Sequence, residues 1–178
     1  MTEFEFLSVL ISIIFGLALT HILSGSIRAI YAGRTTENHL VYTGFVLVVM
    51  VLNWWVIFSW RDHQHWSFDV FLLLVFWAIS HYVLAITLYP PGAATAADFE
   101  IHRRWFFCAF IAMALLDIGQ TAMRGDLFRP WYYLLFVLHY AVLAILALKV
   151  SSKLFQRVLS WWFLLSILIW SLMVRRFL

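Results

Sequence analysis

The sequence predicts an all-α integral membrane protein, in which about six transmembrane helices form one compact bundle with no soluble domain. Three observations predict this class. Of the 178 residues, 65% are hydrophobic and 12% are charged, whereas soluble domains are about half apolar and a quarter charged. The apolar residues gather in six long stretches, and the connections between these stretches are short. We therefore expect a single polytopic membrane domain over residues 1–178.

The first predicted span, residues 6–27, is long enough to cross a hydrocarbon core of about 30 Å and contains one ionisable side chain, His21. Small residues recur in it at every fourth position, which places them on nearly one side of a helix. We name this set the small-residue seam: Ser8, Ser12, Gly16, Thr20 and Ser24. Small side chains let helices approach closely in lipid, so we expect the seam to pack against another helix, with a pore lining as the alternative.

The second and third spans are predicted over residues 40–60 and 70–89. Asn53 is the one strongly polar residue of the second span, and His81 lies inside the third. Two prolines follow the third span and end it, because proline cannot continue a helix.

The loop between these two spans carries an H-x-H pair, His63 and His65. Such a pair is a weak candidate for a divalent metal, with Asp69 as a third ligand. A structural metal site usually needs about four ligands. We therefore expect a solvated loop and no bound metal.

The longest connection leads into the fourth span, residues 105–123. A capping pattern at Thr95 predicts a short helix there, which lies at the membrane surface before it turns into the span. Arg103 and Arg104 fit a contact with anionic lipid headgroups. The alternative is that these two arginines only determine topology.

The fourth span is the most polar one. Its polar residues Asp117, Gln120, Thr121 and Arg124 are spaced i, i+3, i+4 and i+7, so they share one helix face. A carboxylate inside a membrane needs a cation, hydrogen-bond donors or water. Asp117 would pair with Arg124 or with a histidine of another span, either as a structural bridge or as part of a pathway for ions or protons.

The fifth and sixth spans are predicted over residues 131–148 and 158–174, with His139 in the middle of the fifth. With the N-terminus outside, seven cationic residues lie inside and five outside. The inner ones are Arg28, Arg34, Arg103, Arg104, Lys149, Lys153 and Arg157, and the outer ones are Arg61, Arg124, Arg129, Arg175 and Arg176. This weak excess favours both termini outside, in a bacterial cytoplasmic membrane.

The intramembrane histidines His21, His81 and His139 admit three interpretations. They would hydrogen-bond neighbouring helices, handle protons or ions together with Asn53, or hold a b-type haem. The haem hypothesis requires His21 and His81 to lie at similar depth. No cofactor is otherwise expected.

The sequence carries no nucleotide-binding motif, and its net charge of +3 reflects loop residues and not a nucleic-acid surface. An enzyme is the less favoured class. The leading hypothesis is a small inner-membrane protein that forms a homo-oligomer and handles ions, protons or a small solute, as a channel, a transporter or a membrane-depolarising effector. Two alternatives stay open: a haem-b or quinone-linked redox subunit, and a non-catalytic anchor or assembly subunit that joins a partner membrane subunit.

Overall fold

The computed structural model describes residues 2–33, 35–90 and 96–173, and every regular element in these ranges is a helix. The helices are α1 (Glu3–Tyr31), α2 (Glu37–Val56), the 3₁₀ helix η1 (Ile57–Trp60), α3 (Phe68–Leu88), α4 (Ala96–Met123), α5 (Tyr133–Lys149) and α6 (Lys153–Met173). Five segments of the described chain are long and apolar enough to cross a membrane, namely α1, α2 with η1, α3, α4 and α6. The shorter α5 has 17 residues. The all-α class is confirmed, and length and composition indicate a multi-pass membrane protein.

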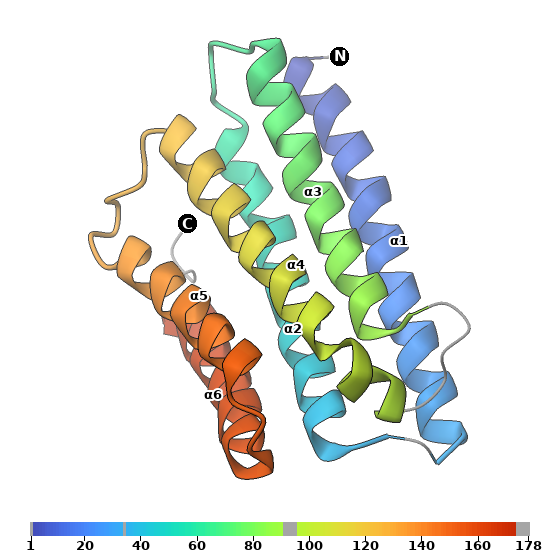
Figure 1. Cartoon of the computed structure of the whole chain (residues 1–178). Coiled ribbons are helices and arrows are strands. Elements are labelled where there is room, and N and C mark those ends of the chain that lie inside the picture. Colours follow the sequence, from blue (N-terminus) through green and yellow to red (C-terminus); the bar gives the residue numbers. More distant parts are fainter. Residues whose placement is uncertain (1, 34, 91–95, 174–178) are drawn as a thin grey trace.

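Consecutive helices run in opposite directions (Figure 1). Helices α1, α3, α4 and α5 lie side by side, and α2 and α6 pack behind them. The N-terminus and the turns after η1 and α4 share one end of the bundle, which we call the N-terminal end. The turns after α1 and α5 lie at the other end, which we call the opposite end.

Most helices begin before the predicted apolar spans because polar side chains cap their first turns. Thr2 and Glu5 form a capping box at the start of α1, and Thr36 and Ser67 cap α2 and α3. The predicted surface helix before the fourth span is not a separate element, since α4 runs without a break from Ala96 to Met123. Its expected cap, Thr95, lies outside the described residues, as do Arg34, Val174, Arg175 and Arg176.

Large aromatic side chains fill the space between α2, α4 and α6. The Phe45 ring lies 5.5 Å from that of Phe110 and 5.1 Å from that of Phe163, and Tyr42 lies 5.4 Å from Phe106, as measured between centroids. The outer faces of the helices are apolar as well, because a bilayer interior solvates aliphatic side chains. Hydrophobicity alone therefore does not distinguish the interior of the bundle from its exterior.

Helix α1 packs on α3 and carries a row of buried apolar side chains beside the small-residue seam: Leu7, Ile11, Phe15, Ala18 and Ile22. The closest approach is at Gly25, where a Cβ atom would lie 2.5 Å from Cγ of Tyr89. At Gly16 a Cβ atom would meet no other group within 4 Å. Thr20 is exposed and the other four seam residues are half-buried. Among the described residues the seam therefore has no tight partner at Gly16, and its packing against a second chain stays a prediction.

Candidate functional site

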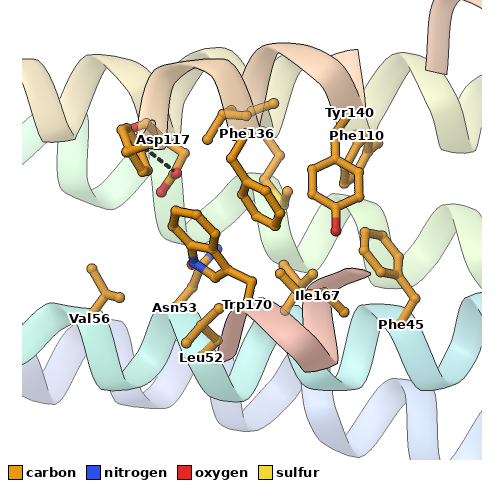
Figure 2. A pocket seen from close by; sticks show the side chains of 15 residues that line it. Phe45, Leu52, Asn53, Val56, Phe110, Asp117, Phe136, Tyr140, Ile167 and Trp170 are labelled. Carbon is orange, nitrogen blue, oxygen red and sulfur yellow. Dashed lines mark hydrogen bonds between the residues drawn. The ribbon is translucent and has the colours of Figure 1, made fainter. Parts of the chain in front are cut away.

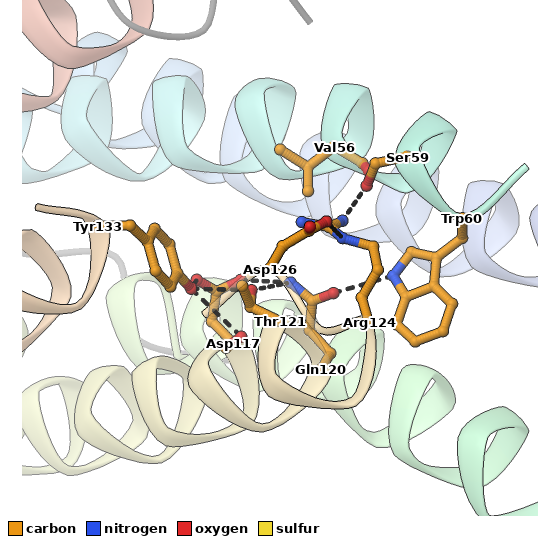
Figure 3. A network of polar contacts seen from close by, with 9 residues as sticks. All are labelled: Val56, Ser59, Trp60, Asp117, Gln120, Thr121, Arg124, Asp126 and Tyr133. Carbon is orange, nitrogen blue, oxygen red and sulfur yellow. Dashed lines mark hydrogen bonds and ion pairs between the residues drawn. The ribbon is translucent and has the colours of Figure 1, made fainter. Parts of the chain in front are cut away.

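The polar face of α4 lies near the N-terminal end of the bundle. Asp117 stands six residues before the last residue of α4, about 9 Å along the axis at 1.5 Å per residue. Helical spacing places Gln120 and Thr121 beside it, and Gln120 Nε2 donates to Asp117 Oδ1 at 3.2 Å and to Thr121 Oγ1 at 3.0 Å. The sequence-predicted grouping of these three residues is thus present in the fold (Figure 3).

Three uncharged donors from three helices hold the Asp117 carboxylate. Besides Gln120 on the same helix, Trp77 of α3 donates its Nε1–H to Oδ1 at 3.1 Å, and the Tyr133 hydroxyl of α5 donates to Oδ2 at 2.7 Å. Asp117 therefore links α3, α4 and α5 through its hydrogen bonds.

The donors of Asp117 are themselves positioned by further bonds. Gln120 Oε1 accepts from the Trp60 indole of η1 at 2.9 Å, and the hydroxyls of Thr121 and Tyr133 lie 3.0 Å apart. Trp60 and Gln120 are each 1% exposed. Buried networks of this kind are rigid when every polar group has a partner.

Arg124 does not pair with Asp117. Its Nε lies 2.6 Å from Oδ2 of Asp126 in the following turn, and its Nη1 donates to the Ser59 hydroxyl of η1 (Figure 3). No histidine hydrogen-bonds Asp117 within the described residues either. In the described part of the chain, the hydrogen-bond donors of Asp117 are therefore all uncharged, and no cationic side chain pairs with it.

A cavity adjoins Asp117 between α2, α4, α5 and α6 (Figure 2). It contains about 560 Å³ of empty space, part of it open to the surroundings, of which about 60 Å³ is accessible to the centres of water molecules. A single water needs roughly 10–15 Å³ by such a measure, so the cavity has room for several. Asp117 and Asn53 are polar lining residues, and most of the wall is apolar or aromatic, including Phe45, Phe110, Phe136, Tyr140 and Trp170.

His81 is fully buried on α3, and both of its ring nitrogens are engaged. Nδ1 lies 2.8 Å from the Trp77 carbonyl oxygen, which can only accept, so Nδ1 carries the proton. Nε2 then accepts from the Asn53 amide of α2 at 2.7 Å. The imidazole is thus a neutral bridge between α2 and α3, one helical turn from the Trp77 that donates to Asp117.

His21 and His81 do not lie at similar depth, contrary to the sequence-based expectation. His21 Nε2 lies 2.7 Å from the carbonyl oxygen of Tyr89, at the opposite end of α3. Tyr89 follows His81 by eight residues, which is about 12 Å along a helix. Ligation of a haem iron by this pair would require the bonds of both imidazoles to break and the rings to approach one another.

His139 on α5 donates from Nδ1 to the Phe136 carbonyl oxygen, and its Nε2 has no partner within the described residues. His39, which the sequence does not single out, caps the end of α3: its Nε2 lies 2.9 Å from the Leu88 carbonyl oxygen. His39 and His21 thereby satisfy two of the carbonyls that a helix C-terminus leaves without partners.

The remaining candidates lie near the ends of the bundle. The His63 ring lies 3.1 Å from the carbonyl oxygen of His65 and packs on Trp60 and Trp66. No group of three or more metal-ligating side chains occurs among the described residues. Arg104 is exposed, and Arg103 lines a hollow at the opposite end.

Trp77 and Tyr133, the two aromatic donors of Asp117, are missing from the sequence-based set. Aromatic residues are abundant in the chain, at 19%, so their type alone carries little information. A signal does exist for Trp77, which stands four residues before His81 and therefore on the same face of α3. None exists for Tyr133, which reaches Asp117 only through the turn after α4.

No family model, no curated protein and no solved structure matches this chain. The function proposed below therefore follows from the geometry of the Asp117 site and its cavity.

Proposed function

We propose that this protein binds a proton or a small cation at Asp117 and passes it through the membrane, as an oligomeric channel or transporter. One observation carries the proposal. The Asp117 carboxylate borders an internal cavity and is held by uncharged donors, with no cationic side chain paired to it in the described part of the chain. An ionisable residue at membrane depth is by default a candidate functional site.

The carboxylate retains capacity for one more partner. Two carboxylate oxygens offer about four acceptor positions. Oδ1 accepts from Trp77 and Gln120, and Oδ2 accepts from the Tyr133 side chain. The remaining position on Oδ2 suits one proton or one N–H group of a ligand. Binding of a positive group would neutralise the charge that the fold keeps inside the bundle.

The cavity wall favours a proton or a weakly hydrated organic cation over a metal ion. Hard metal cations take six or more oxygen ligands, whereas most of this wall is carbon. Aromatic faces attract organic cations by about 0.5–2 kcal/mol each when water is excluded. Phe136 and Trp170 would supply such faces near an ammonium group held by Asp117.

Assembly and orientation complete the proposal. A chain of 178 residues has little interior, so we infer that the small-residue seam of α1 joins two or more copies. We place the protein in a bacterial cytoplasmic membrane with both termini outside. The excess of cationic residues at the opposite end supports this orientation.

The test is Asp117→Asn in proteoliposomes. Asparagine keeps the shape of the side chain but cannot ionise. Its NH₂ group replaces a carboxylate oxygen that accepted a hydrogen bond, so the donor at that position loses its acceptor. We expect a folded protein, destabilised by about 1–3 kcal/mol, that loses at least nine-tenths of its proton flux or tetraethylammonium uptake. Proton flux is followed with an entrapped pH indicator and uptake with radiolabelled tetraethylammonium.

Asp62→Asn is the matched control, because Asp62 is an exposed carboxylate at the same end of the bundle. It should retain wild-type flux. If Asp117→Asn folds and transports as well as the control does, Asp117 has no part in function and the proposal fails.

A further inference from the structure

A basic hollow occupies the opposite end of the bundle, between the first turns of α2 and α6 and the N-terminal part of α4. It contains about 1320 Å³ of empty space, part of it open to the surroundings, and is separate from the cavity at Asp117. Three cationic residues line it: Arg103 of α4, and Lys153 and Arg157 of α6. Among the described lining residues, Glu37 of α2 is the acidic one. The described wall therefore carries two more positive than negative charges.

The single carboxylate of the hollow does not neutralise it. Glu37 Oε2 lies 3.1 Å from Arg157 Nε, but the two side chains are 47% and 62% exposed. Exposed ion pairs of this kind contribute about 0–1 kcal/mol and exchange partners readily. Lys153 has no hydrogen bond or ion pair within the described residues. An anion that enters the hollow would thus meet Lys153 and the exposed Arg157, whose pair with Glu37 is weak.

The backbone around the hollow is firmly held. Gln156, which is 2% exposed, donates from Nε2 to the carbonyl oxygens of Ala147 at 3.3 Å and Val150 at 2.7 Å. These bonds fix the turn between α5 and α6 and so set the position of Lys153 and Arg157, which are four residues apart on one helix face. The first turns of α2 and α6 also direct the positive ends of their dipoles to this region.

An apolar track leads from the hollow along α6. Trp161 follows Arg157 by one turn, is 41% exposed, and donates its Nε1–H to Glu37 Oε1 at 2.9 Å. Leu154 and Val158 beside it are 71% and 61% exposed. Cationic groups at the end of a span, followed by exposed tryptophan and aliphatic side chains, match the headgroup and acyl regions of a bilayer.

We propose that the basic hollow is a binding site for the headgroup of an anionic phospholipid. The phosphodiester accepts hydrogen bonds from Arg103, Lys153 and Arg157, and the acyl chains lie along the exposed face of α6. A freely soluble phosphate would use the cationic groups but not the apolar track. This lipid site does not depend on a cation pathway at Asp117, so a negative result for one proposal leaves the other unaffected.

The experiment counts bound lipid on the full-length protein by native mass spectrometry. The protein in detergent is offered phosphatidylglycerol and phosphatidylcholine with identical acyl chains. We expect the wild type to retain phosphatidylglycerol at least tenfold better, because each cationic residue near an anionic group contributes about fivefold. The variant carrying Arg103→Gln, Lys153→Gln and Arg157→Gln should lose this preference.

The matched control carries Arg61→Gln, Arg129→Gln and Lys149→Gln, three exposed positions outside the hollow. It removes the same charge and should keep the lipid preference. Lys153 is exposed, so Lys153→Gln alone should leave the fold intact. It should weaken the retention of phosphatidylglycerol about fivefold. An equal loss in the control would overturn the proposal, as would full retention in both hollow variants. Displacement of phosphatidylglycerol by millimolar inorganic phosphate would also overturn it, because the hollow would then be a site for soluble anions.

Discussion

At the scale of single residues, Trp77 connects Asp117 to the buried His81. Its indole N–H donates to Asp117, and its carbonyl oxygen accepts from His81 Nδ1. An unpaired polar group is costly in an apolar interior. Aromatic donors and a backbone carbonyl meet this requirement, and no cationic side chain of the described residues pairs with Asp117. This arrangement is the basis of the proposal that Asp117 binds a proton or a small cation.

Of the two glycines in α1, Gly25 is the one at which an added side chain would meet a close neighbour. In Gly25→Ala the new methyl group would lie 2.5 Å from Cγ and 2.8 Å from Cβ of Tyr89, so α1 and α3 must move apart. We expect a loss of about 1–3 kcal/mol in the free energy of unfolding, as for other overpacked cores. Thermal unfolding in detergent measures it.

Gly16→Ala is the control for this substitution. The new methyl group has no neighbour within 4 Å, and alanine is the better helix former by roughly 0.5–1 kcal/mol. We expect unchanged or slightly higher stability. Equal melting temperatures for the two variants would show that the contact between Gly25 and Tyr89 does not constrain the packing of α1.

At the scale of elements, α1 presents three different faces. One packs on α3 through Phe15 and its neighbours, one exposes aliphatic residues such as Ile13 and Leu17, and the small-residue seam lies between them. Near the start of the seam, Ser12 accepts from the Trp54 indole of α2 at 3.3 Å. A half-buried strip with small side chains is the form that a contact between two membrane helices takes.

Gly16→Leu tests whether the seam joins two copies of the chain. The open space at Gly16 accommodates a larger side chain within one subunit, so the fold should survive. Between subunits the same side chain would separate backbones that approach closely there. We expect a shift from oligomer to monomer in native mass spectrometry, with unchanged helix content by circular dichroism. A wild-type oligomer distribution would mean that the seam packs nothing between subunits.

Helices α5 and α6 form the hairpin that closes both candidate sites. The Tyr140 hydroxyl of α5 lies 2.7 Å from the Ser166 hydroxyl of α6, and the rings of Phe136 and Trp170 stack at 3.9 Å. These contacts line the cavity of Asp117, while the turn between the two helices borders the basic hollow. At 17 residues, α5 is near the lower limit for a membrane span.

At the scale of the whole molecule, the two ends of the bundle have different chemistry. The N-terminal end carries the network of Asp117 and the Arg124–Asp126 ion pair. The opposite end carries the histidine caps of α3 and the basic hollow. Because the inner surface of a bacterial membrane favours cationic loops, we expect the opposite end to face the cytoplasm.

Cysteine labelling in intact cells tests this orientation. Ser151→Cys at the opposite end and Gln64→Cys at the N-terminal end both place an exposed thiol in a turn. They are made in a Cys108→Ser background, since Cys108 is the single native cysteine. In intact cells an impermeant thiol reagent should label only the Gln64→Cys variant. After the membrane is permeabilised it should label both variants. The reverse pattern would invert the orientation and leave the fold unchanged.

The sequence by itself determined the class of the protein, the approximate position of its helices and the shared face of Asp117, Gln120 and Thr121. Hydropathy over a span and helical spacing are local properties, so they can be read along the chain. The partners of Asp117 were decided only by the tertiary structure, because Trp77 and Tyr133 come from other helices, 40 and 16 residues away. Tertiary packing also brought Arg124 to Ser59 of η1 and placed the close approach of α1 at Gly25 and not at Gly16. In a bundle whose inner and outer faces are both apolar, the sequence does not mark which face of a helix is buried. That choice depends on how large side chains of different helices fit together.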